Sequence, residues 1–122
     1  HYAQVRLVCL ENTHNGHGGR VFRIDEMERT AAWAREQGLR VHLDGARIFN
    51  AAAGAGVDVS EWTREVDTMM FCISKGLGAP IGSLLCGPAS LMREARRLKI
   101  LYGGAWRQAA RESSRTRRSP SA

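Results

Sequence analysis

Short apolar runs alternate with stretches of helical periodicity along most of the chain. The first run, VRLVCL at 5–10, contains β-branched residues and gives way to the glycine-rich NTHNGHGG, a pattern typical of a buried strand that enters a loop. A helix is predicted next, over about 25–37, because Asp25 and Glu28 match a capping box and Gly38 supplies a stop. Its apolar positions at helical spacing are Met27, Ala31 and Ala34.

The middle of the chain repeats this alternation. RVHLD at 40–44 predicts a second strand. The alanine-rich segment 46–53 predicts a helix that is ended by Gly54 and Gly56. Ser60 can cap a further short helix.

Two more strands and a last helix are predicted before residue 103. The segment 67–74, DTMMFCIS, contains an apolar run that is hydrophobic on both faces, as strands inside parallel sheets usually are. A fourth strand is predicted at 81–86, and Gly87-Pro88 opens the helix. On one face that helix carries Leu91, Ala95 and Leu98.

Strands that alternate with helices over short connections indicate an α/β fold with a mostly parallel sheet and flanking helices. Ligands of such folds gather beyond the carboxyl ends of the strands, where Asp44 and Lys75 both fall. We expect one domain over 1–110. The segment 111–122 has no apolar residue before Ala122, and we expect it to be a disordered basic tail.

Charge and composition narrow the range of partners. The 122 residues are 43% hydrophobic and 25% charged, as is usual for a globular domain. The formal net charge is +6, and 111–122, with four Arg and one Glu, contributes half of it. Because this segment has no aromatic residue for base stacking, we expect weak, salt-dependent binding to acidic partners at most, and no dedicated nucleic-acid site.

The cysteines bear on the compartment. Cys9, Cys72 and Cys86 are odd in number and lie far apart in apolar runs. This predicts buried free thiols of a reducing compartment rather than a disulfide framework or a zinc site. The sequence has no apolar stretch of about 18 residues and no secretory pattern at its start, so we expect a cytoplasmic protein without a membrane span.

Two residues at strand ends could carry chemistry. Lys75 lies in the glycine-rich SKGLGAP, and if desolvated it would lose a proton and become a nucleophilic amine; the alternative is a surface lysine in a loop. Asp44 could keep a cationic ring nitrogen protonated, as in pyridoxal phosphate sites, or it could form an Asp-Gly turn or a helix cap. Together, one residue would hold the ring and the other its aldehyde.

Four motifs resemble the low-specificity threonine aldolase family. In chain order they are LENTHN (10–15), HLDGARIFNA (42–51), SKGLGAPIGS (74–83) and GGAWRQ (103–108). The resemblance covers about 1–110 and implies part of the large domain of the type I pyridoxal phosphate fold. It also implies a homotetramer, a pyridoxal 5'-phosphate cofactor, and cleavage of β-hydroxy-α-amino acids, chiefly threonine and allo-threonine, to glycine and an aldehyde.

The same resemblance implies a role for each matching residue. Lys75 matches the catalytic lysine that binds the cofactor covalently, and Asp44 matches the aspartate on the pyridine nitrogen. Arg47 matches the arginine near the cofactor's O3 and the substrate carboxylate. Arg107 matches an arginine of the cofactor region, and we expect it to reach the phosphate. His1 lines up with a histidine near the substrate hydroxyl, where it would bind substrate and transfer a proton during the retro-aldol step.

The chain also departs from the family. It starts after the family's glycine-rich phosphate-binding segment and the histidine stacked on the ring, and no segment here replaces that phosphate anchor. After Gln108 it has AARESSRTRRSPSA where the family continues with an alanine-rich helix and a further domain. We therefore expect a fragment that is weakly active or inactive alone, with exposed sheet edges.

The remaining alternatives concern a metal site, His42 and a different lyase reaction. Glu11, His14 and His17 have the spacing of a metal cluster, but the glycines among and after them indicate a turn, so we expect no metal there. His42, in the strand beside Asp44, is expected to be a packed core histidine. Among lyases of the same fold, a β-eliminating enzyme for aromatic amino acids would release pyruvate and ammonia instead of glycine and an aldehyde.

Overall fold

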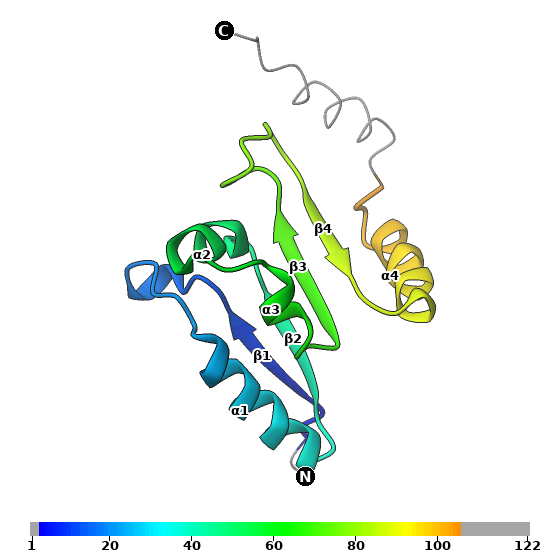
Figure 1. Cartoon of the computed structure of the whole chain (residues 1–122). Helices are drawn as coiled ribbons and strands as arrows, with labels where there is room; N and C mark the ends of the chain where they lie inside the picture. The colour runs from blue at the N-terminus through cyan, green and yellow to red at the C-terminus, as the bar shows by residue number, and fades with distance from the viewer. Residues whose placement is uncertain (1–2, 106–122) are drawn as a thin grey trace, which may run out of the picture.

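The computed structural model describes residues 3–105. Its described part contains a four-stranded sheet in the order β1-β2-β3-β4 (Figure 1). The first three strands are parallel and the fourth is antiparallel to the third. The strands are β1 (Leu7–Glu11), β2 (Arg40–Asp44), β3 (Thr68–Cys72) and β4 (Ser83–Cys86). The predicted α/β fold with a mostly parallel sheet is therefore confirmed.

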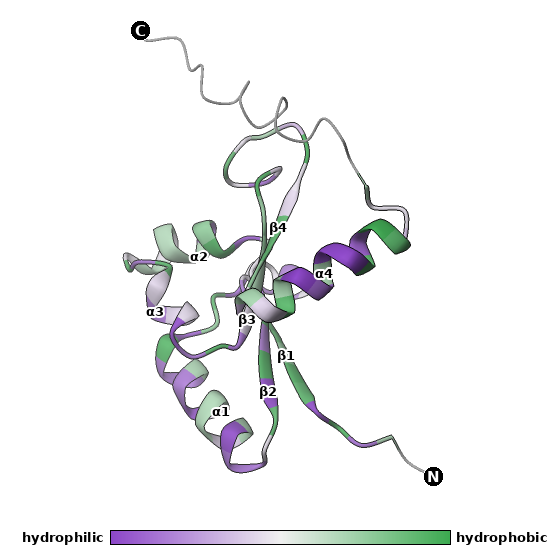
Figure 2. Ribbon diagram, turned by 90° about the vertical axis from the view of Figure 1, so that its right-hand side faces the viewer, coloured by the Kyte–Doolittle hydropathy of each residue, from purple (hydrophilic) through white to green (hydrophobic). Residues whose placement is uncertain are grey.

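Helices follow β1, β2 and β4, whereas the described segment between β3 and β4 contains no helix. They are the 3-10 helix η1 (Asn15–His17) and the α-helices α1 (Ile24–Glu36), α2 (Ile48–Ala55), α3 (Ser60–Thr63) and α4 (Ala89–Leu101). Viewed along the sheet, α1, α2 and α3 lie on one side and α4 lies on the other (Figure 2). The two faces of the sheet therefore have different environments.

The core lies between the sheet and the three helices α1, α2 and α3. Because side chains alternate along a strand, Val41, Leu43 and Met69 point toward these helices and are buried. Two clusters make up this core: one contains Met27, Leu43, Ile48, Ala51, Trp62 and Met69, and the other contains Ala31, Ala34 and Val41. Trp62 is fully buried, and its Nε1 donates a hydrogen bond to the carbonyl oxygen of Phe22 at 2.9 Å.

The opposite sheet face is open over much of its area. None of the residues of α4 is buried, and all four residues of β4 are exposed. The thiols of Cys9 and Cys86 are exposed and Cys72 is half-buried, so the prediction of buried thiols was wrong. Apolar neighbours in sequence do not bury a cysteine when the strand turns it away from the helices.

The helix boundaries differ from the predicted ones by one to two residues, for identifiable reasons. The N-cap of α1 is Arg23, whose backbone N–H donates to Glu26 Oε2 at 3.1 Å, so the predicted box with Asp25 as cap was wrong. Asp25 instead forms ion pairs with Arg23 and Arg29 on the helix surface. The stop at Gly38 is confirmed by its left-handed φ of 70°.

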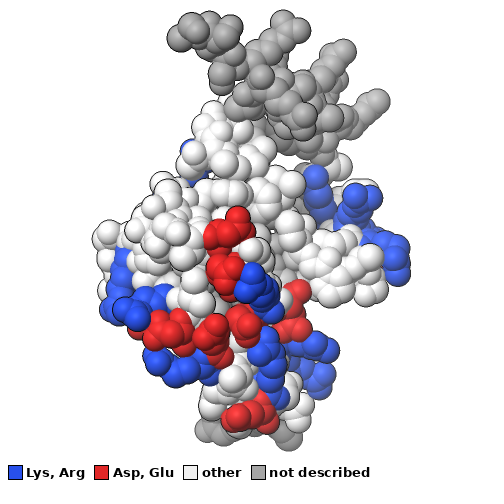
Figure 3. All heavy atoms as spheres, viewed as in Figure 1, with Lys and Arg blue, Asp and Glu red and all other residues white. Residues whose placement is uncertain are grey.

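Charged side chains are distributed unevenly over the described surface. Acidic and basic residues are interspersed over α1 and α3, whereas basic residues gather over α4 (Figure 3). The basic residues of α4 are Arg93, Arg96, Arg97 and Lys99. Within residues 3–105, none of the helices is long and apolar enough to cross a membrane. The segment 111–122, predicted to be a disordered tail, lies outside the described residues.

Candidate active site

The carboxyl ends of β1, β2 and β3 meet at one edge of the sheet, and Asp44 is the last residue of β2. In register it lies between Glu11 of β1 and Met70 of β3. The half-buried Asp44 accepts the backbone N–H of Ala46 with Oδ1 at 3.0 Å. Asp44 therefore does form an Asp-Gly turn, the alternative to a cofactor role. Its Oδ2 nevertheless makes no hydrogen bond within the described part of the chain and can bind a ligand.

The turn after Asp44 packs directly against β3. The N–H of Gly45 donates to the carbonyl oxygen of Met70 at 2.8 Å. A β-carbon on Gly45 would lie 3.0 Å from that oxygen and 3.1 Å from Ile48 Cβ, so the close approach requires glycine. Arg47 follows as the half-buried N-cap of α2, and its carbonyl accepts the N–H of Asn50 at 2.9 Å. Because only the turn at 45–46 separates them, Arg47 stays close to Asp44 along the chain.

Lys75 begins a tight turn in the segment that connects β3 to β4. Its carbonyl accepts the N–H of Gly78 at 2.9 Å, and Gly78 has a left-handed φ of 69°. The Ala79 N–H donates a hydrogen bond to the Ile73 carbonyl at 2.9 Å, and the Ile73 N–H donates one to the Gly82 carbonyl at 3.0 Å. These bonds hold the two sides of the segment together. Lys75 itself is exposed, as in the alternative of a surface lysine in a loop, and the described residues do not desolvate its ammonium group.

Asn50 connects the Lys75 turn to α2. Its Oδ1 lies 2.5 Å from the position that a β-carbon on Gly76 would take. The first turn of α2 and the residue after Lys75 are therefore adjacent, which brings Asp44, Arg47 and Lys75 to the same edge of the sheet. Asn50 was not predicted as a site residue, although its spacing of three from Arg47 puts both on one end of the helix.

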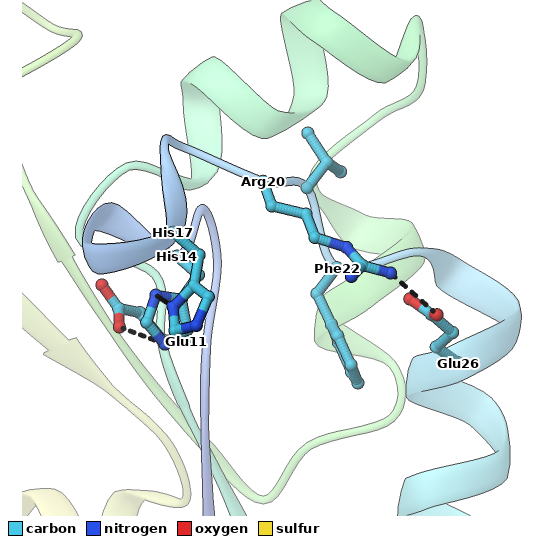
Figure 4. Close-up of a pocket in the computed structure, with 7 residues that line it drawn as sticks. Glu11, His14, His17, Arg20, Phe22 and Glu26 are labelled. Carbon is cyan, nitrogen blue, oxygen red and sulfur yellow. Dashed lines mark hydrogen bonds and ion pairs between the residues drawn. The ribbon is translucent and has the colours of Figure 1, made fainter.

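A cavity of about 290 Å³ adjoins this edge through Glu11 (Figure 4). The rings of His14 and His17 meet there, with their Nδ1 atoms 3.3 Å apart, and Glu11 Oε2 is 3.8 Å from His14 Nε2. On the other side of the cavity Arg20 pairs with Glu26 at 3.7 Å. Within residues 3–105 no group of three or more His, Cys, Asp or Glu is arranged to hold a metal ion.

Three other predicted residues have different outcomes. His1 and Arg107 lie outside the described residues. His42 is half-buried, and its Nδ1 lies 2.7 Å from Thr68 Oγ1. Because the neighbours Val41 and Leu43 point into the core, His42 lies on the opposite face of the sheet, so its prediction as a core residue was wrong.

Residues 1–110 match the family model described as "Beta-eliminating lyase". The chain belongs to this family. The low-specificity L-threonine aldolase 1 of Arabidopsis thaliana is 41% identical over 107 residues, which are 88% of this chain and 30% of that protein. The low specificity L-threonine aldolase of Escherichia coli K12 is 42% identical over 108 residues, 88% of this chain and 32% of that protein.

A solved structure with a similar fold carries a description of the same kind. It is that of a candidate aromatic amino acid beta-eliminating lyase/threonine aldolase from Exiguobacterium sp. 255-15, with a TM-score of 0.75 and 35% identity over 79% of this chain and 27% of that one. The predicted resemblance to threonine aldolases is thus confirmed as a similarity. This member of the beta-eliminating lyase family spans about 30% of the length of the curated relatives it matches.

Proposed function

We propose that the chain is part of a pyridoxal phosphate-dependent aldehyde-lyase that cleaves threonine and allo-threonine to glycine and acetaldehyde. The observation that carries this proposal is the adjacency of Gly76 and Asn50, because it brings the Lys75 turn to the strand edge that holds Asp44 and Arg47. The names of the relatives in Arabidopsis and Escherichia coli favour the threonine cleavage reaction over others of the family.

The residues present at this edge fit pyridoxal phosphate chemically. The Oδ2 atom of Asp44 is available to hold a proton on a ring nitrogen, and the exposed amine of Lys75 can bind an aldehyde carbon. Arg47 offers the planar donor fork that suits a carboxylate. When bound, the cofactor supplies a ring that accepts the electron pair of the broken Cα–Cβ bond.

Each residue of the chain then has one task in the reaction. Lys75 Nζ would hold the cofactor covalently at its aldehyde carbon. Arg47 orients the substrate through its carboxylate, and Asp44 keeps the ring nitrogen protonated. His1 accepts the proton of the β-hydroxyl, while Arg107 binds the phosphate. The proposed assembly is a homotetramer, and the proposed compartment is the cytoplasm.

Borohydride trapping tests the cofactor site. We expect the 122-residue chain, incubated with pyridoxal phosphate and reduced, to carry the phosphopyridoxyl mass on Lys75. In Asp44→Asn the pyridoxal phosphate concentration at half-saturation should rise by about tenfold or more, because a charged hydrogen bond contributes about 1.5–3 kcal/mol. Lys99, the other lysine, is the internal control for nonspecific labelling. Equal labelling of Lys75, Lys99 and the amino terminus would contradict the proposed site.

Product analysis separates the two lyase reactions. Incubated with threonine, the chain loaded with pyridoxal phosphate and left unreduced should release its products, however slowly, as glycine and acetaldehyde in equal amounts. Pyruvate and ammonia from an aromatic amino acid, without glycine, would instead support the β-eliminating alternative suggested by the family's description.

A further inference from the structure

Asn50 lies at the junction between α2 and the turn that carries Lys75. We propose that Asn50 is a positioning residue, whose carboxamide packs against the backbone of Gly76 and thereby sets the direction in which Lys75 leaves the turn. The consequence for cofactor binding rests on the proposed function. The positioning itself is a property of this chain and can be measured without a cofactor.

The geometry limits what can occupy this junction. Asn50 Oδ1 lies 2.5 Å, and Asn50 Cγ 3.3 Å, from the point where a β-carbon on Gly76 would be. The carboxamide therefore fills the volume that a side chain at 76 would need. Because Gly76 directly follows Lys75, a shift of this backbone changes the direction of the Lys75 side chain.

Asn50 is itself held in a fixed place. It is the third residue of α2, and its N–H donates to the carbonyl of the N-cap Arg47. The neighbouring Phe49 packs edge-to-face on Phe71 of β3, with ring centroids 5.5 Å apart. This packing fixes the backbone of the first turn of α2 on the same strand from which the Lys75 turn emerges, so the Asn50 side chain projects from a fixed position beside Gly76.

The contact has a local role rather than a role in global stability. Asn50 is exposed, and its side chain makes no hydrogen bond to another group within the part of the chain that the structure describes. Exposed substitutions of this kind usually leave the free energy of unfolding nearly unchanged. Loss of the carboxamide should therefore loosen the Lys75 turn while the sheet remains folded.

Hydrogen exchange tests the positioning directly. The amide of Gly78, which donates to the Lys75 carbonyl, reports whether the turn is closed. In the cofactor-free chain, Asn50→Ala should raise the hydrogen-exchange rate of the Gly78 amide by about threefold or more relative to wild type. The exchange rates of the β2 amides should stay unchanged. Asn15→Ala, at another exposed asparagine, is the matched control and should leave Gly78 unchanged.

A paired substitution tests the volume argument. Gly76→Ala alone should also loosen the turn, because its β-carbon would lie 2.5 Å from Asn50 Oδ1 and the carboxamide would have to turn away from the junction. In Gly76→Ala/Asn50→Ala the new methyl group occupies the space left by the carboxamide, so protection of Gly78 should return toward the wild-type value. Such a recovery is a coupling between the two sites, and a general loss of stability would not produce it.

Trapping of pyridoxal phosphate at Lys75 in the same four variants separates the two proposals. If wild type is labelled and Asn50→Ala lowers the label together with Gly78 protection, both stand. If wild type is not labelled but Gly78 responds as described, the cofactor site fails and the positioning role stands. Unchanged Gly78 exchange in Asn50→Ala, or additive effects in the double variant, would overturn the positioning role.

Discussion

At the scale of single residues, Asp67 directly precedes β3, and its side chain joins this strand to the start of β2. Its Oδ2 accepts the N–H of Val41 at 2.8 Å, and its Oδ1 accepts Arg40 Nη1 at 2.7 Å. The backbone N–H of Asp67 returns a bond to the Val41 carbonyl at 2.9 Å. Asp67 thus fixes the entry of β3 against the start of β2, far from the candidate active site.

The pH dependence of stability should reflect this carboxylate. The Val41 backbone hydrogen bond and the Arg40 guanidinium lower the pKa of Asp67 below its ordinary value of 3.8. The folded-state pKa is then below that of the unfolded chain, so the stabilisation is complete above about pH 4 and is lost as the pH falls through the lower, folded-state value. We expect Asp67→Asn to lose about 1 kcal/mol of unfolding free energy at pH 7, a value discounted because a third of the Asp67 side chain is exposed. The loss should be smaller at about pH 2.5.

Urea denaturation of both proteins at pH 7 and pH 2.5 measures this difference. Glu28→Gln, which removes an exposed carboxylate from the surface of α1, is the control and should change the midpoint little at either pH. An equal loss in Asp67→Asn at both pH values would mean that charge plays no part in the Asp67 interaction.

At the scale of elements, α3 is too short to be stable by its own hydrogen bonds. A helix of four residues lies below the length at which isolated helices form, so its place depends on Trp62. The indole is fully buried in the core, and its Nε1 shares the Phe22 carbonyl with Asn12 Nδ2. One residue therefore joins α3 to the segment that precedes α1.

Trp62→Phe should destabilise the chain by about 2–4 kcal/mol, because it removes a hydrogen bond and leaves part of the indole volume empty. The midpoint of urea denaturation, followed by far-UV circular dichroism, measures the loss. Trp33→Phe is the matched control, since Trp33 is 52% exposed on α1, and should differ from wild type by less than about 0.5 kcal/mol. Similar losses in both variants would show that burial of Trp62 does not anchor α3.

The secondary-structure elements were predicted from the sequence more accurately than the contacts of the candidate site. The β2 strand was predicted at its observed bounds, because polar and apolar residues alternate along RVHLD and glycines lie close to both of its ends. The cap of α1 was misplaced because two acidic residues, Asp25 and Glu26, compete for roles in its first turn, and only tertiary placement decides between them. At the site, strand ends identified Asp44 and Lys75, but the Asn50 contact depends on how α2 packs against a distant turn.

At the scale of the whole molecule, the open sheet face and α4 form a groove of about 460 Å³. Met70, Leu84, Leu85 and Met92 line it, together with the basic residues Arg96 and Lys99. Leu85 is 47% exposed there, and contiguous apolar surface of this kind binds amphiphilic dyes such as anilinonaphthalene sulfonate in a folded protein. The cationic rim also suits the sulfonate of the dye.

We therefore expect dye fluorescence from the native chain, reduced in Leu85→Thr, which introduces a β-branched residue that suits a strand but removes the apolar contact of Leu85 with the groove. Leu91→Gln is the control, because Leu91 is equally exposed at 46% on α4 but does not line the groove, and its fluorescence should match wild type. Far-UV circular dichroism must remain unchanged in both variants, since partly unfolded chains also bind the dye. If both substitutions lower the fluorescence equally, the dye binds diffusely over α4 and the groove is not a distinct surface of this fold.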